Sequence, residues 1–465
     1  MKFERINPLT GEVASSATAM QVADMSAIVE SAQEGFELWS QQGPNARRTV
    51  LLAAADALQN KQAEFVEAMM SEIGATEGWA MFNLMLGVSM LREAASITTQ
   101  ITGEVIPSDK PGLLAMAVRE PVGVILGIAP WNAPIILGVR AVAVALACGN
   151  AVILKASELC PRTHSFIIEA LAEAGFPEGT VKIVTNAPED AADIVGALID
   201  HPGVKRINFT GSTSVGRIIA KRAAEFLKPC LLELGGKAPF IVLEDANIDE
   251  AVKAAAFGAF MNQGQICMST ERLVVVDAVA DVFAEKLTAK VKSMTTSDPR
   301  EGKSPLGAVV DLSAVERVNS LIENAVELGA TLLTGGVADS VLMPATLIDG
   351  VTSEMRIYRD ESFGPVVSMI RAKDEADAIQ IANDSEFGLS AAVFTADTAR
   401  GLKVARKIKS GICHVNGPTV ADEAQMPFGG VGSSGYGRFG GKAGIDSFTE
   451  LRWITSASEP GHYPI

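Results

Sequence analysis

The sequence predicts an α/β protein made of two doubly wound, parallel-sheet domains of the Rossmann-like type. Three observations lead to this fold class: the length of 465 residues, the alternation of apolar strand-like runs with helical segments, and the presence of two such series. One hydrophobic core seldom supports a chain of this length, so two large domains are expected. Apolar strands separated by helices indicate parallel sheets that are covered on both faces.

The spacing of apolar residues predicts each element. The first hundred residues have helical periodicity, with Val29, Ala32, Phe36 and Trp39 on one face. The strands expected in the first sheet are residues 122–128, 151–154, 181–184, 206–210 and 231–234. Those expected in the second sheet are residues 240–243, 273–276, 391–394 and 412–415, with helices over 281–294 and 312–328. The domains should meet near residues 233–237, and clefts between such domains commonly bind ligands.

Composition argues against several classes of function. The formal net charge is −16 and basic residues are not clustered, so nucleic acid and anionic membranes are not expected partners. The apolar run 133–154 is interrupted by Pro134, Gly138 and Arg140, so a buried helix and strand explain it better than a membrane span. Residues 1–13 lack the pattern of a signal peptide, and we expect a cytoplasmic protein. The five cysteines and four histidines lack metal-ligand spacing, so no metal site is expected.

Two glycine-rich motifs are candidates for a phosphate-binding turn. Residues 211–216 (Gly-Ser-Thr-Ser-Val-Gly) directly follow a predicted strand and open a helix, which places backbone N–H groups where a pyrophosphate could bind. An ordinary tight turn explains the same pattern. Residues 430–435 match G-x-G-x-x-G, but Pro and further Gly on both sides leave no flanking strand or helix, and we reject this motif as a dinucleotide site. The surrounding stretch 428–444 is expected to be an irregular surface segment.

Cys267 and Glu233 are the candidate catalytic residues. Cys267 ends the polar segment 262–267 (Asn-Gln-Gly-Gln-Ile-Cys), a turn that would expose backbone N–H groups, whereas the other four cysteines lie in or beside apolar segments. Glu233 interrupts an apolar strand near the domain junction. Burial would raise the pKa of this carboxyl group toward values useful to a general base, and a salt bridge to Lys237 is the alternative explanation.

An ordered set of motifs contains these residues, and through it the chain resembles the aldehyde dehydrogenase superfamily over essentially its whole length. In chain order the motifs are Pro130-Trp131-Asn132, Ile153-Leu154-Lys155-Ala156-Ser157-Glu158, Phe209-Thr210-Gly211-Ser212, Glu233-Leu234-Gly235-Gly236-Lys237, Asn262-Gln263-Gly264-Gln265-Ile266-Cys267, Glu361-Ser362-Phe363-Gly364-Pro365 and Met426-Pro427-Phe428-Gly429-Gly430. Ala156 replaces the proline that usually follows the lysine, and Gly432 stands where many members carry lysine. Neither difference touches the expected catalytic set.

The resemblance implies the catalytic roles. Cys267 would be the nucleophile and Glu233 the general base. The side-chain amide of Asn132, with the backbone N–H of Cys267, would form the oxyanion hole. An aldehyde would be oxidised to a carboxylic acid through a thioester on Cys267, with water as the expected acyl acceptor.

The resemblance also implies a nicotinamide cofactor. Lys155 and Glu158 would bind the adenosine ribose, Ser212 the pyrophosphate, and Glu361 with Phe363 the nicotinamide ribose. The complete expected cofactor-binding set is Ile128, Trp131, Lys155, Glu158, Gly211, Ser212, Gly216, Leu234, Glu361 and Phe363. NAD is favoured, with NADP possible, because the Glu158 carboxylate should repel a 2′-phosphate.

The family pattern divides the chain as follows. Residues 1–103 and 120–232 would form the NAD-binding domain, and residues 233–445 the catalytic domain. Residues 104–119 and 446–465 would form a small β appendage that mediates oligomerisation, which makes a homodimer or a homotetramer the expected state.

The substrate is expected to be a small aromatic aldehyde. Within the family the chain is most similar to salicylaldehyde, vanillin and benzaldehyde dehydrogenases, a similarity carried by residues 426–453 and 462–465. In a helix that starts after Asn132, Ile136 and Arg140 lie one and two turns along the Asn132 face, where they would line the aldehyde entrance. Arg140 would donate to a ring hydroxyl, while Trp79 and Phe82 flank the ring. The alternative places Arg140 in a structural ion pair and both aromatic residues in the core.

Other functions remain open at this point. An aldehyde dehydrogenase for aliphatic or semialdehyde substrates would share the same motifs. A cysteine hydrolase or acyltransferase would share Cys267 but usually needs a histidine partner, and His414 beside Cys413 lies in a predicted strand where adjacent side chains point apart. A binding or scaffold protein would leave Cys267 and Glu233 unexplained. Dependence on added NAD distinguishes these possibilities.

Overall fold

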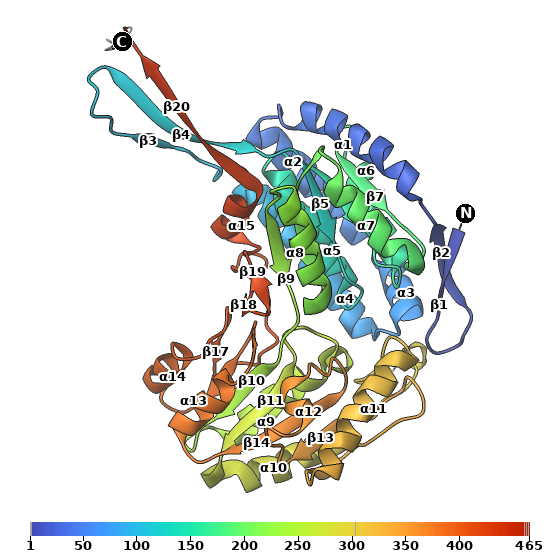
Figure 1. Ribbon diagram of the computed structural model, residues 1–465. Helices are drawn as coiled ribbons and strands as arrows, with labels where there is room; N and C mark the ends of the chain where they lie inside the picture. The colour runs from blue at the N-terminus through green and yellow to red at the C-terminus, as the bar shows by residue number, and fades with distance from the viewer. Residues whose placement is uncertain (1, 303, 460, 462, 464) are drawn as a thin grey trace.

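Two α/β domains face each other across a cleft (Figure 1). The structure is a computed structural model that describes residues 2–302, 304–459, 461, 463 and 465. Each domain is built on one predominantly parallel sheet, as the sequence predicts. Three smaller antiparallel sheets complete the fold.

The first sheet has six strands in the order β19-β9-β8-β5-β6-β7. Its parallel strands are β5 (Val124–Ile128), β6 (Ala151–Lys155), β7 (Val181–Val184), β8 (Val204–Thr210) and β9 (Cys230–Glu233). The edge strand β19 (Gly435–Tyr436) pairs with β9 in the antiparallel direction. The helices of this part of the chain are α1 (Met25–Trp39), α2 (Pro44–Asn60), α3 (Gln62–Ile73), α4 (Glu77–Ile97), α5 (Pro134–Ala147), α6 (Pro161–Glu173), α7 (Ala191–Asp200) and α8 (Thr213–Glu225).

Side-chain alternation along the strands makes this sheet doubly wound. On β5, Ile125 packs into the core that contains α5 and α6, whereas Val124 and Leu126 pack against α1 and α7 on the other face. Both faces are therefore apolar, which is why the strands read as continuous hydrophobic runs. The run 133–154 forms α5 and β6, as predicted, and no helix in the described residues combines the length and apolarity needed to cross a membrane.

The second sheet has seven strands in the order β12-β13-β14-β11-β10-β16-β17. The strands are β10 (Ala238–Val242), β11 (Thr270–Val276), β12 (Thr331–Thr334), β13 (Thr346–Asp349), β14 (Val366–Ala372), β16 (Ala392–Phe394) and β17 (His414–Val415). Only the pairing of β12 with β13 is antiparallel within the described sheet. The helices are α9 (Ile248–Phe260), α10 (Asp277–Lys292), α11 (Leu312–Glu327), α12 (Arg356–Arg359), α13 (Glu375–Asn383) and α14 (Thr398–Ala405).

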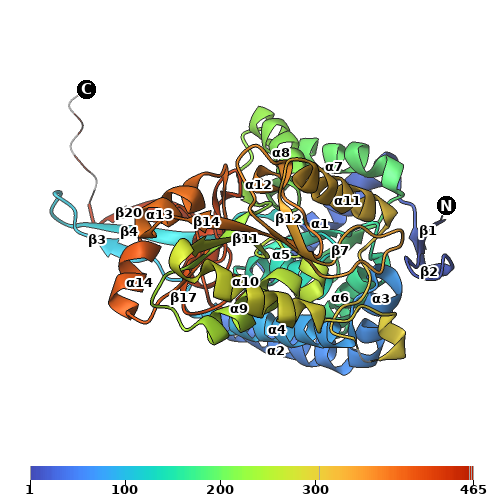
Figure 2. The same cartoon turned by 90° about the horizontal axis from the view of Figure 1, so that it is seen from below.

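Three small sheets and four short 3-10 segments complete the chain. The hairpin β1 (Lys2–Ile6) and β2 (Val13–Thr18) lies at the opposite side of the molecule from the projecting sheet β20-β4-β3 (Figures 1 and 2). The strands of that sheet are β3 (Glu104–Ile106), β4 (Leu113–Pro121) and β20 (Thr449–Ala457), and the helix α15 (Gly441–Phe448) leads into β20. The third pair is β15 (Phe387–Gly388) with β18 (Val431–Gly432). The 3-10 segments are η1 (Val22–Asp24), η2 (Pro188–Asp190), η3 (Met261–Gly264) and η4 (Pro299–Glu301).

The glycine-rich stretch 428–444 differs from its prediction as an irregular surface segment. Phe428, Ser434 and Phe439 are buried, and β19 within it joins the first sheet although the chain arrives from the second. Gly435 has a φ of 104°, and a Cβ there would collide with the Leu232 carbonyl oxygen, so the strand can approach only as glycine. The glycines of the stretch 428–444 permit close packing. The sequence pattern alone does not distinguish such a packed segment from an exposed loop.

Other differences concern short or edge strands. The first hundred residues are helical from η1 onward, but they begin with the hairpin β1–β2, which the helical interpretation missed. The strands β12, β13 and β14 were also not predicted, and the predicted strand over 122–128 begins at Val124. The predicted division of the chain assigns residues 233–445 to one domain, whereas β19 within that range pairs with β9 of the other sheet. Strand pairing of this kind depends on tertiary partners rather than on local periodicity.

Candidate active site

A left-handed turn places Cys267 at the domain junction. Helix α9 ends at Phe260, and Asn262, Gln263 and Gly264 then have φ values of 50°, 55° and 70°. A side chain at Gly264 would collide with the Gly364 carbonyl oxygen, so this position requires glycine. Left-handed backbone at the two non-glycine residues costs about 1–3 kcal/mol each, so surrounding contacts must hold it.

Side-chain amides hold the turn. Asn262 Nδ2 donates to the Asn132 carbonyl at 3.0 Å, and Gln263 Nε2 donates to the Ala308 carbonyl at 2.8 Å. Gln263 Oε1 also accepts from the Gly307 backbone N–H at 3.0 Å. The turn is therefore tied to both halves of the molecule, which fixes the position of Cys267. The sequence shows the polar turn but does not show that Gln263 holds it, because the partners of Gln263 are remote in the chain.

Asn132, the residue predicted to form the oxyanion hole, lies beside this turn. Its Nδ2 donates to the Gln265 carbonyl at 2.9 Å, and its own carbonyl accepts from Trp79 Nε1 at 3.0 Å. These contacts fix the amide with its donor group directed at the backbone that leads to Cys267. An amide nitrogen carries two N–H groups, and the bond to the Gln265 carbonyl uses one of them.

Glu233 is the last residue of β9 and is completely buried. Its Oε2 lies 3.8 Å from Cys267 Sγ, and its Oε1 has no hydrogen-bond partner among the described residues. Burial raises the pKa of Glu233 to about 8, although the positive charge of Arg140 opposes that rise. The alternative salt bridge to Lys237 is absent from the structure, because Lys237 pairs with Glu271.

The surroundings of Cys267 disfavour ionisation of its thiol. Burial is the main cause that raises the pKa of Cys267, and the nearby Glu233 and Glu361 carboxylates add to it. A thiol with a raised pKa needs a base within reach, and Glu233 is the carboxylate in contact with it. The two side chains predicted to be catalytic are therefore in contact with each other.

A cleft of about 850 Å³ runs from the first sheet to Cys267. The expected cofactor residues that line it are Ile128, Trp131, Lys155, Glu158, Gly211, Ser212, Leu234, Glu361 and Phe363. Gly216 lies behind the lining, because a side chain there would collide with Leu234. Ser212 is the N-cap of α8, so the motif at 211–216 is a strand-to-helix turn at the cleft, as predicted.

Polar residues are placed at both ends of the cleft. Glu158 pairs with Lys155 and also accepts from Asn186 Nδ2 at 2.9 Å. At the other end Glu361 Oε1 accepts from the Gly236 backbone N–H at 2.8 Å, and burial raises the pKa of Glu361 to about 7. Carboxylates at these positions can accept hydrogen bonds from ribose hydroxyls, so the cleft fits a dinucleotide.

A buried carboxylate positions the segment that carries Glu361. Glu271 accepts from the backbone N–H and hydroxyl of Ser362 and from the backbone N–H of Phe363. Phe363 has a φ of 45° and its ring lies edge-on to Trp131 with centroids 5.8 Å apart. Neither Glu271 nor Asn186 was recognised from sequence, since each acts through a residue far away in the chain.

None of the four predicted substrate residues, Arg140, Trp79, Phe82 and Ile136, is among the residues that line the cleft, and they have structural partners. Arg140 pairs with Asp422, both side chains being 6% exposed, and the guanidinium lies 4.1 Å from the Phe428 ring centroid. Trp79 and Ile136 are buried, and Trp79 stacks on the half-buried Phe82 with centroids 5.6 Å apart. The ion pair and the core packing named as alternatives are therefore observed. The partner Asp422, in an irregular segment, gave no sequence signal.

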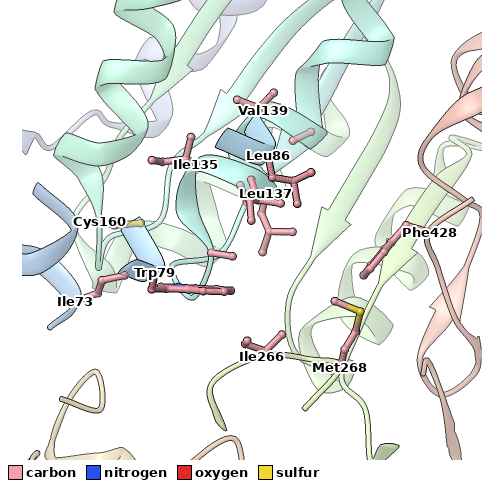
Figure 3. Close-up of a cluster of buried hydrophobic side chains, with 14 of the residues drawn as sticks. Ile73, Trp79, Leu86, Ile135, Leu137, Val139, Cys160, Ile266, Met268 and Phe428 are labelled. Atoms are coloured by element: carbon pink, nitrogen blue, oxygen red, sulfur yellow. The ribbon is translucent and has the colours of Figure 1, made fainter. Parts of the chain in front are cut away.

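Figure 3 shows a cluster of buried apolar side chains that includes the two residues on either side of Cys267 in the sequence. Trp79 comes from α4, Ile266 and Met268 flank Cys267 itself, and Phe428 enters from the glycine-rich segment. These residues are all buried. Cys267 is half-buried and packs against this apolar cluster.

A close cysteine–histidine contact exists elsewhere, but it does not have the character of a hydrolase site. Cys160 Sγ lies 3.9 Å from both ring nitrogens of His164, and both residues are completely buried. Burial lowers the pKa of His164 to about 3 and raises that of Cys160, so neither group ionises readily. Cys160 does not line the cleft.

Comparisons with known proteins agree with this geometry. Residues 1–454 match the aldehyde dehydrogenase family. The chain is 57% identical to the vanillin dehydrogenase of Pseudomonas fluorescens, over 100% of this chain and 96% of that one. It is 36% identical to the benzaldehyde dehydrogenase [NAD(+)] of Pseudomonas putida, over 99% and 94% of the two chains. The crystal structure of a salicylaldehyde dehydrogenase from Pseudomonas putida G7 complexed with salicylaldehyde superposes with a TM-score of 0.98 at 47% identity, covering 100% and 96%. On its motifs, its site geometry and these comparisons, the chain belongs to the aldehyde dehydrogenase family.

Proposed function

We propose that the protein oxidises an aromatic aldehyde to the carboxylate, with NAD as the hydride acceptor and a thioester on Cys267 as the intermediate. The observation that carries this proposal is the convergence of Cys267, Glu233 and Asn132 at the inner end of one large cleft. The names of the vanillin, benzaldehyde and salicylaldehyde dehydrogenase relatives support the aromatic class.

The first step is attack of the Cys267 sulfur on the aldehyde carbon. Glu233 Oε2, at 3.8 Å from the sulfur, can take the thiol proton as attack proceeds. The charge that develops on the aldehyde oxygen is stabilised by the Asn132 amide and the Cys267 backbone N–H. Each such donor is worth roughly 3–4 kcal/mol when it is aimed at the tetrahedral oxygen.

Hydride departure converts the tetrahedral adduct into a thioester. NAD, when bound in the cleft, supplies the hydride acceptor. Lys155 and Glu158 would hold its adenosine ribose, and Glu361 its nicotinamide ribose. The strained segment at Phe363, which Glu271 holds in place, fixes the position of Glu361 relative to Cys267.

Hydrolysis of the thioester needs a general base. Once Glu233 has released the thiol proton to solvent it is again a carboxylate, and its oxygen without a protein partner in the described part of the chain can accept from a water and deprotonate it. The proton taken from this water can then pass to the departing Cys267 sulfur. The Glu233 pKa of about 8 makes this group a stronger base than an exposed carboxylate.

Arg140 can still serve an aromatic substrate although it pairs with Asp422. The hydrogen bond to Asp422 comes from Nη2, and Nε and Nη1 make no hydrogen bond to the described residues. A ring hydroxyl or methoxy oxygen could therefore take one of these donors, while Trp79 and Phe428 contribute apolar surface.

The projecting sheet supports a proposed homo-oligomer. β20 is its edge strand, and Leu451 and Trp453 lie on one face of it with 61% and 77% of their surface exposed. A long edge strand with exposed apolar side chains usually pairs with another surface. We infer that a second copy of the chain covers it.

The function is tested by following NADH formation. Wild-type enzyme should reduce NAD faster with salicylaldehyde, vanillin and benzaldehyde than with a long-chain aliphatic aldehyde. Cys267→Ala should abolish the reaction, whereas Cys413→Ala, which removes a thiol away from the cleft, should not. A preference for aliphatic aldehydes would contradict the proposal that the substrate is an aromatic aldehyde. Cofactor-independent ester hydrolysis without NAD reduction would favour the cysteine hydrolase.

The raised pKa of Glu233 predicts how turnover depends on pH. Because the base must be ionised, kcat should rise as pH increases and level off above about 8. Glu233→Gln should lower kcat by roughly 10²–10⁴-fold and remove this rise. Glu361→Gln, which removes another cleft carboxylate with a raised pKa, should retain the rise even where turnover is lower. An unchanged pH profile in Glu233→Gln would contradict the role of this residue.

The Arg140 assignment is tested by comparing substrates. Leu at this position alone would strand the Asp422 carboxylate, so the variant is Arg140→Leu with Asp422→Asn, and Asp422→Asn alone is the control. Loss of a charged donor to a ring oxygen should raise KM for salicylaldehyde or vanillin about 10-fold more than KM for benzaldehyde. Equal changes in KM for all three aldehydes would show that Arg140 serves only its structural ion pair with Asp422.

The oligomer is tested by replacing apolar residues on β20. Leu451→Glu with Trp453→Glu should shift the molar mass measured by light scattering toward the monomer. Leu402→Glu changes a similarly exposed leucine on α14 and should leave the mass unchanged. A wild-type monomer, or a double variant with wild-type mass, would show that this face does not mediate assembly.

A further inference from the structure

A buried asparagine holds the carboxylate at the adenosine end of the cleft. Asn186 follows β7 and Glu158 follows β6, so the two residues meet at the carboxyl ends of neighbouring parallel strands. Asn186 Nδ2 donates to Glu158 Oε1 at 2.9 Å, and Lys155 donates to the same oxygen. Glu158 and Lys155 line the cleft, whereas Asn186 lies behind them and is 1% exposed.

This arrangement leaves one carboxylate oxygen free. Both donors bind Oε1, and no hydrogen bond to Glu158 Oε2 is present within the described residues. An ionised carboxylate that is held by one oxygen cannot rotate freely, so the other oxygen keeps a defined direction. A free acceptor of this kind suits a vicinal pair of ribose hydroxyls and disfavours a phosphate at the same place.

One polar atom of the Asn186 side chain is buried at an energetic cost. Its Oδ1 is buried without a hydrogen-bond partner in the part of the chain that the structure describes. Exchanging the amide oxygen and nitrogen would place an acceptor against the Glu158 carboxylate, so the observed orientation is set by that carboxylate and by the Ala187 carbonyl, which accepts at 2.8 Å. Buried polar atoms are normally satisfied, and an exception beside a ligand cleft points to a role other than packing.

The loop does not depend on Asn186 for its anchoring. The neighbouring Thr185 Oγ1 donates to the Thr18 carbonyl at 2.8 Å, and the Thr185 carbonyl accepts from the Met20 backbone N–H at 3.1 Å. These bonds tie the loop to the N-terminal hairpin independently of the Asn186 side chain. The hydrogen bond from Asn186 to Glu158 is therefore not needed to anchor the loop, and it can position the Glu158 carboxylate.

We propose that Asn186 is a positioning residue for cofactor selectivity, holding Glu158 by one oxygen so that the other faces the adenosine ribose. The inference rests on the proposed binding of NAD in this cleft. Without the amide, Lys155 alone restrains the carboxylate, which can then turn away from the ribose. Discrimination against NADP should weaken as a result, while the chemistry at Cys267 is unaffected.

The test measures kcat/KM for NAD and for NADP with one aromatic aldehyde at saturation. Asn186→Ala should lower the NAD:NADP ratio about 10-fold, the effect of losing one hydrogen bond to a charged group. Asn186→Asp keeps the shape but sets a second carboxylate against Glu158, and should lower the ratio further. Thr185→Val is the matched control, because it removes a buried hydrogen bond in the same loop, and it should leave the ratio unchanged.

A double-mutant cycle separates positioning from general destabilisation. Glu158→Gln should lower the NAD:NADP ratio by itself, and Asn186→Ala added to it should have little further effect, because both act through one carboxylate. Unchanged ratios in both Asn186 variants, or additive effects in the cycle, would overturn the proposal. If Asn186→Ala does not fold, Asn186→Asp and its cycle with Glu158→Gln provide the same comparison. Failure of wild-type enzyme to reduce NAD would instead overturn the proposed function.

Discussion

The turn from Asn262 to Gly264 is the constraint on which the active site depends. Three successive residues in left-handed backbone conformation reverse the chain after α9 and bring Cys267 to the domain junction. Such a turn is unfavourable in isolation and persists only when its surroundings determine it. Here the side chains of Asn262 and Gln263 bond to backbone on opposite sides of the junction. These bonds hold the strained turn in place and so fix the position of Cys267.

Hydrogen bonds of the neighbouring Gln265 also connect the two domains. Gln265 Oε1 accepts from the Val310 backbone N–H at 2.9 Å, and the Val310 carbonyl accepts from Arg5 Nη2 at 2.9 Å. Because the Gln265 carbonyl also receives the Asn132 amide, the N-terminal hairpin, the cleft wall and the oxyanion donor form one continuous network. Networks with all members satisfied are rigid, which suits donors that must be preorganised for a transition state.

Buried carboxylates have two distinct tasks in this network. Glu271 is fully occupied, with Lys237, Ser362 and Phe363 as its partners, and it shapes the wall of the cleft. Glu233 has few partners, and burial raises its pKa to about 8. The two groups differ in the number of donors around them, since Glu233 Oε1 has no hydrogen-bond partner among the described residues. The proposed role of Glu233 as a base rests on this contrast.

The sequence by itself determined the main features of the fold and of the chemistry. Continuous apolar strands alternating with helices indicated two parallel sheets, and Cys267, Glu233 and Asn132 could be proposed as site residues because each lies in a local motif. Local pattern also located the phosphate-side turn at 211–216. These features are encoded by neighbouring residues, so they can be read without knowledge of the fold.

Only the tertiary structure decided which partners these residues have. It paired Lys237 with Glu271 and not Glu233, joined Arg140 to Asp422, and placed Asn186 behind Glu158. It also brought β19 into the first sheet and gave a buried role to a glycine-rich stretch that looks like a surface loop. Each of these contacts joins segments whose spacing in the chain carries no periodic signal. The physical reason is that hydrogen bonds and ion pairs act over a few ångströms in space, whatever the separation along the sequence.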